Sequence, residues 1–492
     1  MASDAAPGNK RQKIENIDTA PDQDDHDVEM PEAAASPVKA VAGNTADYSS
    51  WSVQQLMKMY YGRLFPHQDM FKWLAYGNDS KHPQADLAYF HKREFCFTLD
   101  GDIFVRYQSF KDGEELRAAI NNKLPAKIDI GPVYNVDPKH RNAYAGLEGN
   151  RKFMPVEREL VFDIDLTDYD DVRTCGKGAH ICNKCWPLMA VAIKILDVGL
   201  RQDFGFKHIL WVFSGRRGVH AWVCDPRARK MSDKARSAVA SFLSVHKGQE
   251  KGVSRLTTSA ASKDHPFLDA AYQCLEEVWT EVILPQQQLF ESSEHWTAAL
   301  AHIPDPDVRD KLGRAWSNNG KGRPSDNSDD LNVARWNELV HELASMSRLP
   351  NKDKPSKAQL QAAESKAKKD IVFACAYPRL DIEVSKKMNH LLKAPFCVHP
   401  KTGKVCVPID PENAENFDPV DGVPTVSQLL TDLDQSDIKQ STADMQNQWK
   451  HTALQKAVAD FHDCFLDGLL ASNRDELATK ARKAVSQPTT RW

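Results

Sequence analysis

Two aspartates alternate with apolar residues in one short segment. Asp163 and Asp165 lie in the apolar run from Leu160 to Leu166, which predicts a β-strand. On a strand, residues two apart point to the same face, about 6.5 to 7 Å from each other. Two carboxylates held this way repel each other unless a cation or a proton relieves the repulsion. The pair therefore favours a two-magnesium phosphoryl-transfer site, although glycosyl transferases, calcium loops and plain strand ends share the pattern.

A second acidic segment occurs much later in the chain. Asp381 and Glu383 alternate with apolar residues after Pro378. We expect a strand over residues 371–384, with both carboxylates on one face and Arg379 on the other. Together with the first pair, this segment raises the odds of a metal site. The alternative is a strand that reaches solvent at the face of the sheet.

A loop rich in glycine and arginine lies between two apolar runs. The segment 213–220 reads Phe-Ser-Gly-Arg-Arg-Gly-Val-His. Glycines let backbone amides approach an anion, and the hydroxyl of Ser214 can donate to it. Arg216 and Arg217 offer bidentate forks for phosphate oxygens, and His220 adds a donor. The Lys-Ser/Thr pair of a P-loop is absent, so the loop predicts a different phosphate site or, alternatively, a basic hairpin turn.

Basic residues also follow Asp381. Acids that are flanked by basic groups suggest a site for metal and polyphosphate. The basic residues of this stretch are Lys386, Lys387, Lys393, His399, Lys401 and Lys404.

Three cysteines and one histidine crowd into a short segment. Cys175, His180, Cys182 and Cys185 offer four nitrogen or sulfur ligands, and the Cys-x-x-Cys end is typical of zinc-binding turns. Four protein ligands leave no open coordination position, so we expect a structural zinc. His180 is the least certain of these ligands, and buried thiols are the alternative.

The secondary structure predicted around these residues mixes strands with helices. This mixture favours a two-layer α/β or α+β core. Helical spacing occurs around Leu56–Leu64 and in Trp186–Asp203. Two further helices are expected over Thr452–Leu470 and Asp475–Val485. Strands are expected over Glu94–Leu99, Ile103–Tyr107, Lys127–Gly131, Leu160–Leu166, Ile209–Phe213, Val219–Cys224 and Val405–Ile409.

Composition excludes several classes of protein. The 492 residues include 64 Lys and Arg against 68 Asp and Glu, a net charge of −4. Gly, Cys and apolar content exclude collagen-like, disulfide-scaffold and wholly disordered chains. We expect no membrane span and no secretion signal, and therefore a reducing compartment. Residues 1–45 carry nine acids and four bases, which predicts a disordered tail. Its Lys10, Arg11 and Lys13 are compatible with a nuclear address or with plain solvated residues.

In this order, the motifs resemble the small, catalytic subunit of archaeal and eukaryotic replicative DNA primase. The resemblance runs with interruptions from about Tyr60 to Asp410. It rests on Arg93-Glu94-Phe95, KIDIG at 127–131, ELVFDIDLTDYDDVRTC at 159–175, CNKCW at 182–186, DFGFKH at 203–208, WVFSGRRGVHAWVCD at 211–225, YPRLDIEVS at 377–385, NHLLKAPFCVHPKTG at 389–403 and VPID at 407–410.

The resemblance implies roles for individual residues. The catalytic acids correspond to Asp163, Asp165 and Asp381, which would hold two Mg²⁺ or Mn²⁺ ions. The triphosphate pocket corresponds to Ser214, Arg216, Arg217, His220, Lys393 and His399. Further active-site positions correspond to Arg106, Lys127, Asp129 near the ribose, and Glu94, whose role the sequence does not explain.

One departure concerns the zinc ligands. Animal relatives carry a second cysteine where this chain has Gly176. Archaeal relatives use a histidine just before the next cysteine, which favours His180. The fourth ligand stays open.

The resemblance also implies an architecture. We expect a primase-type α/β (α+β) catalytic core with a mixed sheet, a structural zinc knuckle and a helical insertion subdomain. The expected segments are a disordered acidic tail (1–45), the first part of the core (46–250) with the knuckle at 173–186, the insertion (251–370), the second part of the core (371–430), and a polar linker with C-terminal helices (431–492).

The implied activity is de novo synthesis of RNA primers from ribonucleoside triphosphates on single-stranded DNA, in the nucleus. The expected partners are an iron-sulfur large primase subunit and DNA polymerase α with its accessory subunit. Three alternatives stay open: a primase-polymerase of damage tolerance that prefers deoxynucleotides, a non-catalytic zinc-knuckle nucleic-acid adaptor, and a sugar-nucleotide transferase, which would not need the Ser-Gly-Arg-Arg-Gly loop.

Overall fold

The structure is a computed structural model. It describes residues 48–79, 82–250, 253–256, 265–318, 330–346, 356–436 and 447–486, all of which belong to one unit. The predictions for the tail at 1–45, including its short basic cluster, lie outside these residues. Within them, no helix combines the length and the apolar character that crossing a membrane requires.

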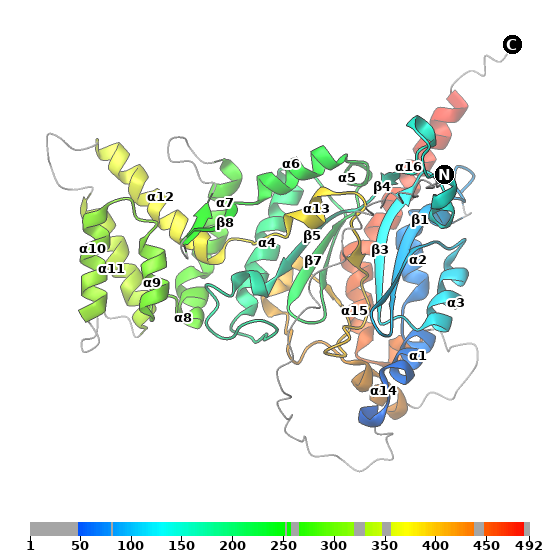
Figure 1. Ribbon diagram of the computed structural model, residues 1–492, viewed down its shortest axis with the longest axis horizontal. Helices are drawn as coiled ribbons and strands as arrows, with labels where there is room; N and C mark the ends of the chain where they lie inside the picture. The colour runs from blue at the N-terminus through cyan, green and yellow to red at the C-terminus, as the bar shows by residue number, and fades with distance from the viewer. Residues whose placement is uncertain are drawn as a thin grey trace, which may run out of the picture. The chain divides into compact units, whose positions relative to one another are not determined.

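Two antiparallel sheets hold most of the candidate residues (Figure 1). The first has the order β10-β3-β1-β2, with β4 paired to β3. The second has the order β11-β6-β7-β5, and β8 pairs with β9 in a separate hairpin. The strands are β1 (Arg93–Leu99), β2 (Ile103–Gln108), β3 (Lys127–Tyr134), β4 (Pro155–Glu157), β5 (Leu160–Asp165), β6 (Ile209–Phe213), β7 (Gly218–Val223), β8 (His246–Glu250), β9 (Val253–Leu256), β10 (Leu392–Lys393) and β11 (Pro408–Ile409).

The expected mixed sheet is wrong for the described residues, because the paired strands run antiparallel. The loops that join β1 to β2 and β6 to β7 are only a few residues long. Such short loops connect antiparallel neighbours, whereas parallel strands need a long crossover.

The helices fall into three groups along the chain. Before β3 lie α1 (Val53–Arg63), α2 (His67–Ala75) and α3 (Gly113–Lys123). Between β5 and β8 lie α4 (Trp186–Gln202), α5 (Pro226–Arg229) and α6 (Asp233–Leu243). The remaining helices are α7 (Pro266–Val278), α8 (Leu284–Gln287), α9 (Ser293–Leu300), α10 (Pro306–Asn318), α11 (Leu331–Met346), α12 (Lys357–Ala376), α13 (Ile382–Lys386), α14 (Val426–Gln435), α15 (Leu454–Phe461) and α16 (Asp467–Ser486).

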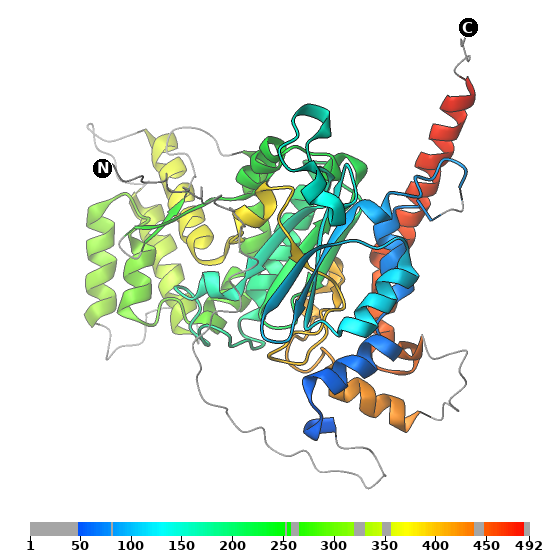
Figure 2. The same cartoon turned by 45° about the vertical axis from the view of Figure 1, so that its right-hand side comes forward.

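Helices α9 to α11 lie together to one side of the sheets in both views (Figures 1 and 2). Helix α12 packs on α11 and α7, and it leads the chain back toward β5 through α13. Helix α7 packs on α4, so the core of the sheets continues into the helical segment.

The strand expected over residues 371–384 is wrong. Residues up to Ala376 continue α12, and the chain resumes as helix α13 after Asp381. Ile371, Val372 and Phe373 are buried, so this apolar run is the inner end of a helix. A short apolar run looks the same in a buried helix and in a buried strand, and Pro378 marks the break between the two helices.

The C-terminal helices also differ from the prediction. A π-helical turn, His462–Leu466, links α15 directly to α16, which runs through the expected break near residue 472. No glycine or proline interrupts the chain at that point, and therefore nothing stops the helix. The other predicted strands and helices before Lys247 are confirmed to within three residues.

Candidate functional site

Asp163 and Asp381 meet through their backbones. Asp163 lies on β5, and its carbonyl oxygen accepts a hydrogen bond of 3.1 Å from the backbone N–H of Asp381. Asp381 is the N-cap of α13, and its carboxylate accepts from the N–H of Glu383 at 2.9 Å. Two acids that are distant in the sequence are therefore neighbours in space. Asp381 and Glu383 do not alternate on a strand face, which corrects the prediction.

Arg379 fixes this juxtaposition. Its guanidinium donates to the carbonyl oxygen of Asp168 and to the carboxylate of Asp171, in the turn that follows β5. Its backbone N–H donates to the hydroxyl of Tyr169 at 3.0 Å. These bonds hold the segment before Asp381 against the end of β5. The sequence did not single out Arg379 for this role, although its place two residues before Asp381 was a usable signal.

Asp165 lies at the end of β5 and is paired with Arg217. The Arg217 Nε lies 2.9 Å from both carboxylate oxygens, and the N–H of Thr167 donates to one of them at 2.7 Å. Burial by itself would raise the pKa of Asp165, but the charge of Arg217 and these hydrogen bonds lower it overall. Asp165 is therefore held ionised beside the loop.

The raised pKa of Asp168 shows that negative charge is concentrated in this region. Burial, followed by the charges of Asp165 and Asp381, raises its pKa to about 6. The three candidate carboxylates do not form a closed set, however. Among the described residues, the one group of three or more His, Cys, Asp or Glu ligand atoms that all lie within 4.8 Å of one another is made of cysteines. The aspartates are joined through the Asp163 and Asp381 backbones, while the Asp165 carboxylate is paired with Arg217.

The Ser-Gly-Arg-Arg-Gly loop is the turn of the β6–β7 hairpin. Ser214 Oγ accepts from the N–H of Gly218 at 3.0 Å, so its own proton can be donated outward. Gly215 has φ +88°, and a Cβ there would lie 2.8 Å from the Cβ of His399. Only glycine fits both the conformation and the close approach. The loop therefore packs directly on the segment that carries His399.

Burial and neighbouring positive charges keep His220 and His399 neutral. His220 pairs with Asp163 across β7 and β5, and its Nε2 lies 3.5 Å from the Asp163 carboxylate. Burial and the charge of Lys393 lower the pKa of His220 to about 3. Burial, Lys393 and Arg216 lower the pKa of His399 to about 2. The cations around both rings create a positive field that suits a polyphosphate.

The first sheet adds further charged groups to the same region. Lys393 on β10 is the register partner of Asp129 on β3. Lys127, also on β3, lies 3.7 Å from the Asp129 carboxylate, and its charge contributes to the lowered pKa of His220. All three side chains are buried. The candidate residues of the two sheets thus surround one region.

Glu94 has a structural role that the sequence did not reveal. It is fully buried on β1 and accepts hydrogen bonds of 3.0 Å from Arg106 Nε and from the Tyr134 hydroxyl. The backbone N–H of Tyr107 donates to it as well, at 3.2 Å. Glu94 therefore orients Arg106 on the edge strand β2, which makes it a positioning residue.

Glu159, immediately before β5, belongs to a buried network of ion pairs and hydrogen bonds. It is fully buried and lies 3.0 Å from both Arg93 and Arg158, while the Tyr76 hydroxyl donates to it at 2.7 Å. Breaking one member of a buried ion pair costs about 3–5 kcal/mol. The sequence offered a signal, an acid directly before a buried strand, which was not used.

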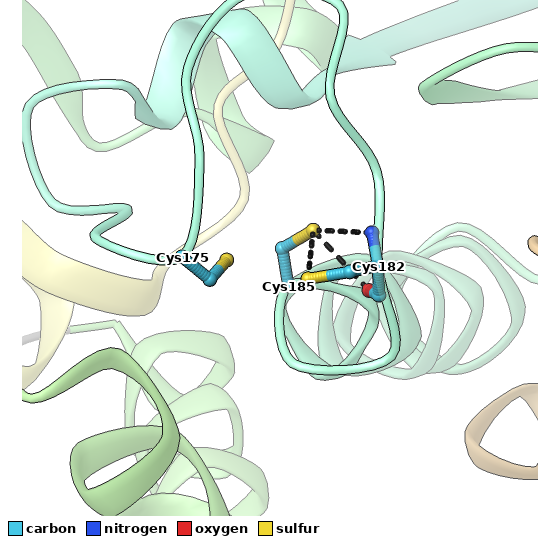
Figure 3. A group of neighbouring side chains, drawn as sticks. All are labelled: Cys175, Cys182 and Cys185. Carbon is cyan, nitrogen blue, oxygen red and sulfur yellow. Dashed lines mark hydrogen bonds between the residues drawn. The ribbon is translucent and has the colours of Figure 1, made fainter. Parts of the chain in front are cut away.

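The three cysteines form the closed ligand group. The sulfurs of Cys182 and Cys185 lie 3.7 Å apart, and the Cys182 N–H donates to the Cys185 sulfur at 3.2 Å. Cys175 reaches them from a separate arm of the loop (Figure 3). Thiolates at this spacing fit zinc. His180 is exposed, and its ring nitrogens do not belong to this group.

These arrangements define a class of protein. Acids from separate segments lie beside a buried cluster of lysines, arginines and histidines, as in a metal-dependent enzyme that transfers nucleotidyl groups. A family model for the DNA primase small subunit matches residues 162–411. That range includes the three aspartates, the β6–β7 loop and the cysteine cluster.

Individual relatives agree. The DNA primase small subunit of Schizosaccharomyces pombe is 41% identical over 382 residues, 78% of each chain. That of Drosophila melanogaster is 40% identical over 400 residues, which cover 80% of this chain and 84% of the relative. The Saccharomyces cerevisiae protein is 35% identical over 79% of this chain and 87% of its own length. The chain belongs to the DNA primase small subunit family.

Proposed function

We propose that this chain starts RNA primers on single-stranded DNA by joining ribonucleoside triphosphates. DNA primase small subunits are nucleotidyltransferases, and the similarity to eukaryotic members covers most of the chain. The observation that carries the proposal is the 3.1 Å hydrogen bond between Asp381 and Asp163, which brings distant acids together beside Arg217.

Asp163, Asp165 and Asp381 supply hard oxygen donors, which Mg²⁺ and Mn²⁺ prefer. The charges that raise the pKa of Asp168 mark an excess of negative charge that divalent cations would offset. When bound there, two such ions would activate the 3′-hydroxyl of one nucleotide and neutralise the pyrophosphate that leaves the other. The pairing of Asp165 with Arg217 keeps one carboxylate ionised and oriented for this task.

The basic side of the pocket binds the incoming triphosphate. Ser214 donates its hydroxyl proton, Arg216 and Arg217 offer forked donors, and Lys393 adds a point charge. Phosphate charge would raise the pKa of His220 and of His399, because the phosphate favours the charged ring. These groups orient the phosphates and balance charge, which are the main protein contributions to phosphoryl transfer.

The first sheet positions the rest of the nucleotide. Lys127 and Asp129 lie on β3 next to Lys393, and the proposed place for the ribose is beside Asp129, where a 2′-hydroxyl can be recognised. Arg106 is held toward the site by Glu94. Zinc bound by the cysteine cluster would have a structural role, because its ligands are buried or half-buried soft donors.

Partners follow from the name of the family. A small subunit implies a larger partner and a DNA template. The finer proposal is an iron-sulfur large subunit together with DNA polymerase α and its accessory subunit, acting in the nucleus. Apart from the tail, the chain has 60 bases and 59 acids, because the tail holds four of 64 bases and nine of 68 acids. Such balance offers few phosphate contacts, so template binding should depend on the partner.

The test is de novo synthesis by purified chain on single-stranded DNA, with and without the large subunit, using ribo- or deoxynucleotides and Mg²⁺ or Mn²⁺. We expect dinucleotides and short RNA from ribonucleotides, and none from Asp163→Asn, with its zinc content unchanged. Asp310→Asn on exposed α10 is the matched control. Preference for deoxynucleotides would favour a damage-tolerance enzyme. The absence of any synthesis with either metal would favour a non-catalytic adaptor.

A further inference from the structure

The cysteine cluster needs a fourth ligand, and the three sulfurs do not supply it. His180 is a poor candidate in this structure. It is exposed, and its ring nitrogens lie outside the ligand group. The backbone around it is fixed, since the buried Arg173 donates to the carbonyl oxygens of His180 and, at 3.0 Å, of Gly178.

A residue from the helical segment reaches the cluster instead. Gln287 ends helix α8, and only 1% of its surface is exposed. Its Oε1 lies 3.6 Å from the sulfur of Cys175. Its amide spans both arms of the cysteine loop, because Oε1 accepts from the Thr174 N–H at 3.2 Å and Nε2 donates to the carbonyl oxygen of Lys184. The Thr174 hydroxyl donates to the Gln287 backbone carbonyl.

These contacts fix which end of the amide faces the cysteines. The N–H of Thr174 can only donate, and the carbonyl of Lys184 can only accept. Oε1 must therefore point toward Thr174 and Cys175, and Nε2 must point toward Lys184. An amide binds metal ions through its carbonyl oxygen, and here this oxygen is the atom that faces the cysteine cluster.

The spacing agrees with a tetrahedral zinc site. With Zn–S of about 2.3 Å and Zn–O of about 2.1 Å, tetrahedral angles place two sulfurs about 3.8 Å apart, and a sulfur and an oxygen about 3.6 Å apart. The distance between the Cys182 and Cys185 sulfurs is 3.7 Å. The distance from the Cys175 sulfur to Gln287 Oε1 is 3.6 Å. Each of these two distances is close to the corresponding edge of a tetrahedral zinc site.

We propose that Gln287 Oε1 is the fourth ligand of the zinc bound by Cys175, Cys182 and Cys185. The metal then joins the cysteine loop to helix α8, which lies about a hundred residues further along the chain. The Lys184 carbonyl orients the amide in the way that outer hydrogen bonds orient zinc ligands. This assignment is independent of the proposed synthesis of primers.

The test compares zinc retention in the full chain carrying Gln287→Ala, Gln287→Glu or His180→Ala, with Gln286→Ala as the matched control on the same helix. Zinc per chain is measured by atomic emission, and its release is followed with a chelating dye. Co²⁺ substitution gives a visible spectrum that reports the donor set. Far-UV circular dichroism confirms folding.

We expect Gln287→Ala to release zinc about 10- to 100-fold faster, the range for disrupted zinc-site partners, and to shift the Co²⁺ bands. Gln287→Glu keeps an oxygen donor, and it should hold zinc at least as well as the unaltered chain. His180→Ala and Gln286→Ala should match the unaltered chain. If Gln287→Ala folds poorly, the Glu variant and His180→Ala decide. Faster release from His180→Ala, or unchanged release and Co²⁺ bands in Gln287→Ala, would overturn the assignment.

Discussion

The aspartate site and the cysteine cluster both fit a metal ion, but they are built differently. The cysteine sulfurs come from one short loop and already lie within 4.8 Å of one another. The aspartates come from β5 and from the start of α13, and among the described residues their oxygens form no such set. Asp381 is exposed, whereas Cys185 is buried.

The difference follows from charge and solvation. The cysteine sulfurs can pack together before a metal arrives, because the hydrogen bond from Cys175 lowers the pKa of Cys185 to about 5. The same bond raises the pKa of Cys175, so the two sulfurs share one proton instead of both being charged. Carboxylates are already charged at neutral pH and repel each other. Arg217 offsets the charge of Asp165, and a backbone hydrogen bond ties Asp163 to Asp381. A closed, soft site can keep its metal permanently, whereas an open, hard site exchanges its metal with each substrate.

Brief treatment with a chelator should empty the aspartate site of metal and leave the zinc in the cysteine cluster. Mg²⁺ keeps several waters and is bound through few carboxylates, so EDTA should abolish synthesis within seconds. Zinc in a closed four-ligand site should stay bound over the same period. The assay combines primer synthesis with zinc quantification after rapid desalting, and added Mg²⁺ should restore full activity. Loss of zinc in proportion to loss of activity would contradict the division between the sites.

Asp381→Asn tests the open site at its most exposed ligand. We expect at least about a 100-fold loss in kcat, because charge stabilisation in the transition state depends on the ions that this carboxylate helps to hold. The control is Glu383→Gln on the same helix, whose carboxylate pairs with Lys386 at 2.7 Å. It should retain activity to within about twofold, as surface substitutions usually have small effects. Equal losses in both variants would mean that the acids of α13 act only through local structure.

The local parts of this site were predictable from sequence. Strand β5, the β6–β7 hairpin and its loop each depend on a few consecutive residues, and the pattern predicted all of them. The cysteine spacing likewise identified the three sulfur donors. Alternating acids and apolar residues suggested a strand around Asp381, but the same residues form a helix cap, where the carboxylate binds the next turn.

The long-range parts were not predictable, because they depend on single contacts between distant segments. Arg379 joins the turn after β5, Glu94 orients Arg106, and Gln287 reaches the cysteines. The residue type of Gln287 does not mark a partner, and the sequence around Arg379 and Glu94 does not say which distant residue each of them contacts. Glutamine in particular is not a usual zinc ligand, so a ligand search by residue type passes over it.

Arg217→Ala should weaken catalysis more than Arg216→Ala. Arg217 binds both oxygens of Asp165 and also belongs to the β6–β7 loop, which we propose binds phosphate, so its loss should affect kcat and KM together. A hydrogen bond to a charged group contributes about 1.5–3 kcal/mol, which corresponds to roughly a 10- to 100-fold loss in kcat/KM. Arg216 is half-buried and acts on His399, so its variant should raise mainly KM. Steady-state kinetics with varied nucleotide measures both, and identical profiles would refute the double role of Arg217.

The last expected difference between the two sites is a dependence of stability on pH that nucleotide suppresses. Burial lowers the pKa of His67 to about 4, of His220 and His246 to about 3, and of His399 to about 2. Below about pH 6.5 the unfolded chain binds protons at these residues while the folded chain does not. The free energy of unfolding should therefore fall as pH is lowered from 7 toward 4, by up to about 1.4 kcal/mol per pH unit for each histidine.

Chemical unfolding at several pH values measures the slope of the free energy of unfolding against pH. His67 lies outside the phosphate pocket, so His67→Gln should reduce the slope by about one proton whether or not nucleotide is present. A non-hydrolysable triphosphate should reduce it further, because phosphate charge favours protonated His220 and His399 in the folded chain. Added zinc should leave it unchanged, since both rings lie outside the cysteine cluster. If zinc changes this slope and nucleotide does not, His220 and His399 respond to the cysteine cluster and not to the nucleotide site, which would contradict the proposal.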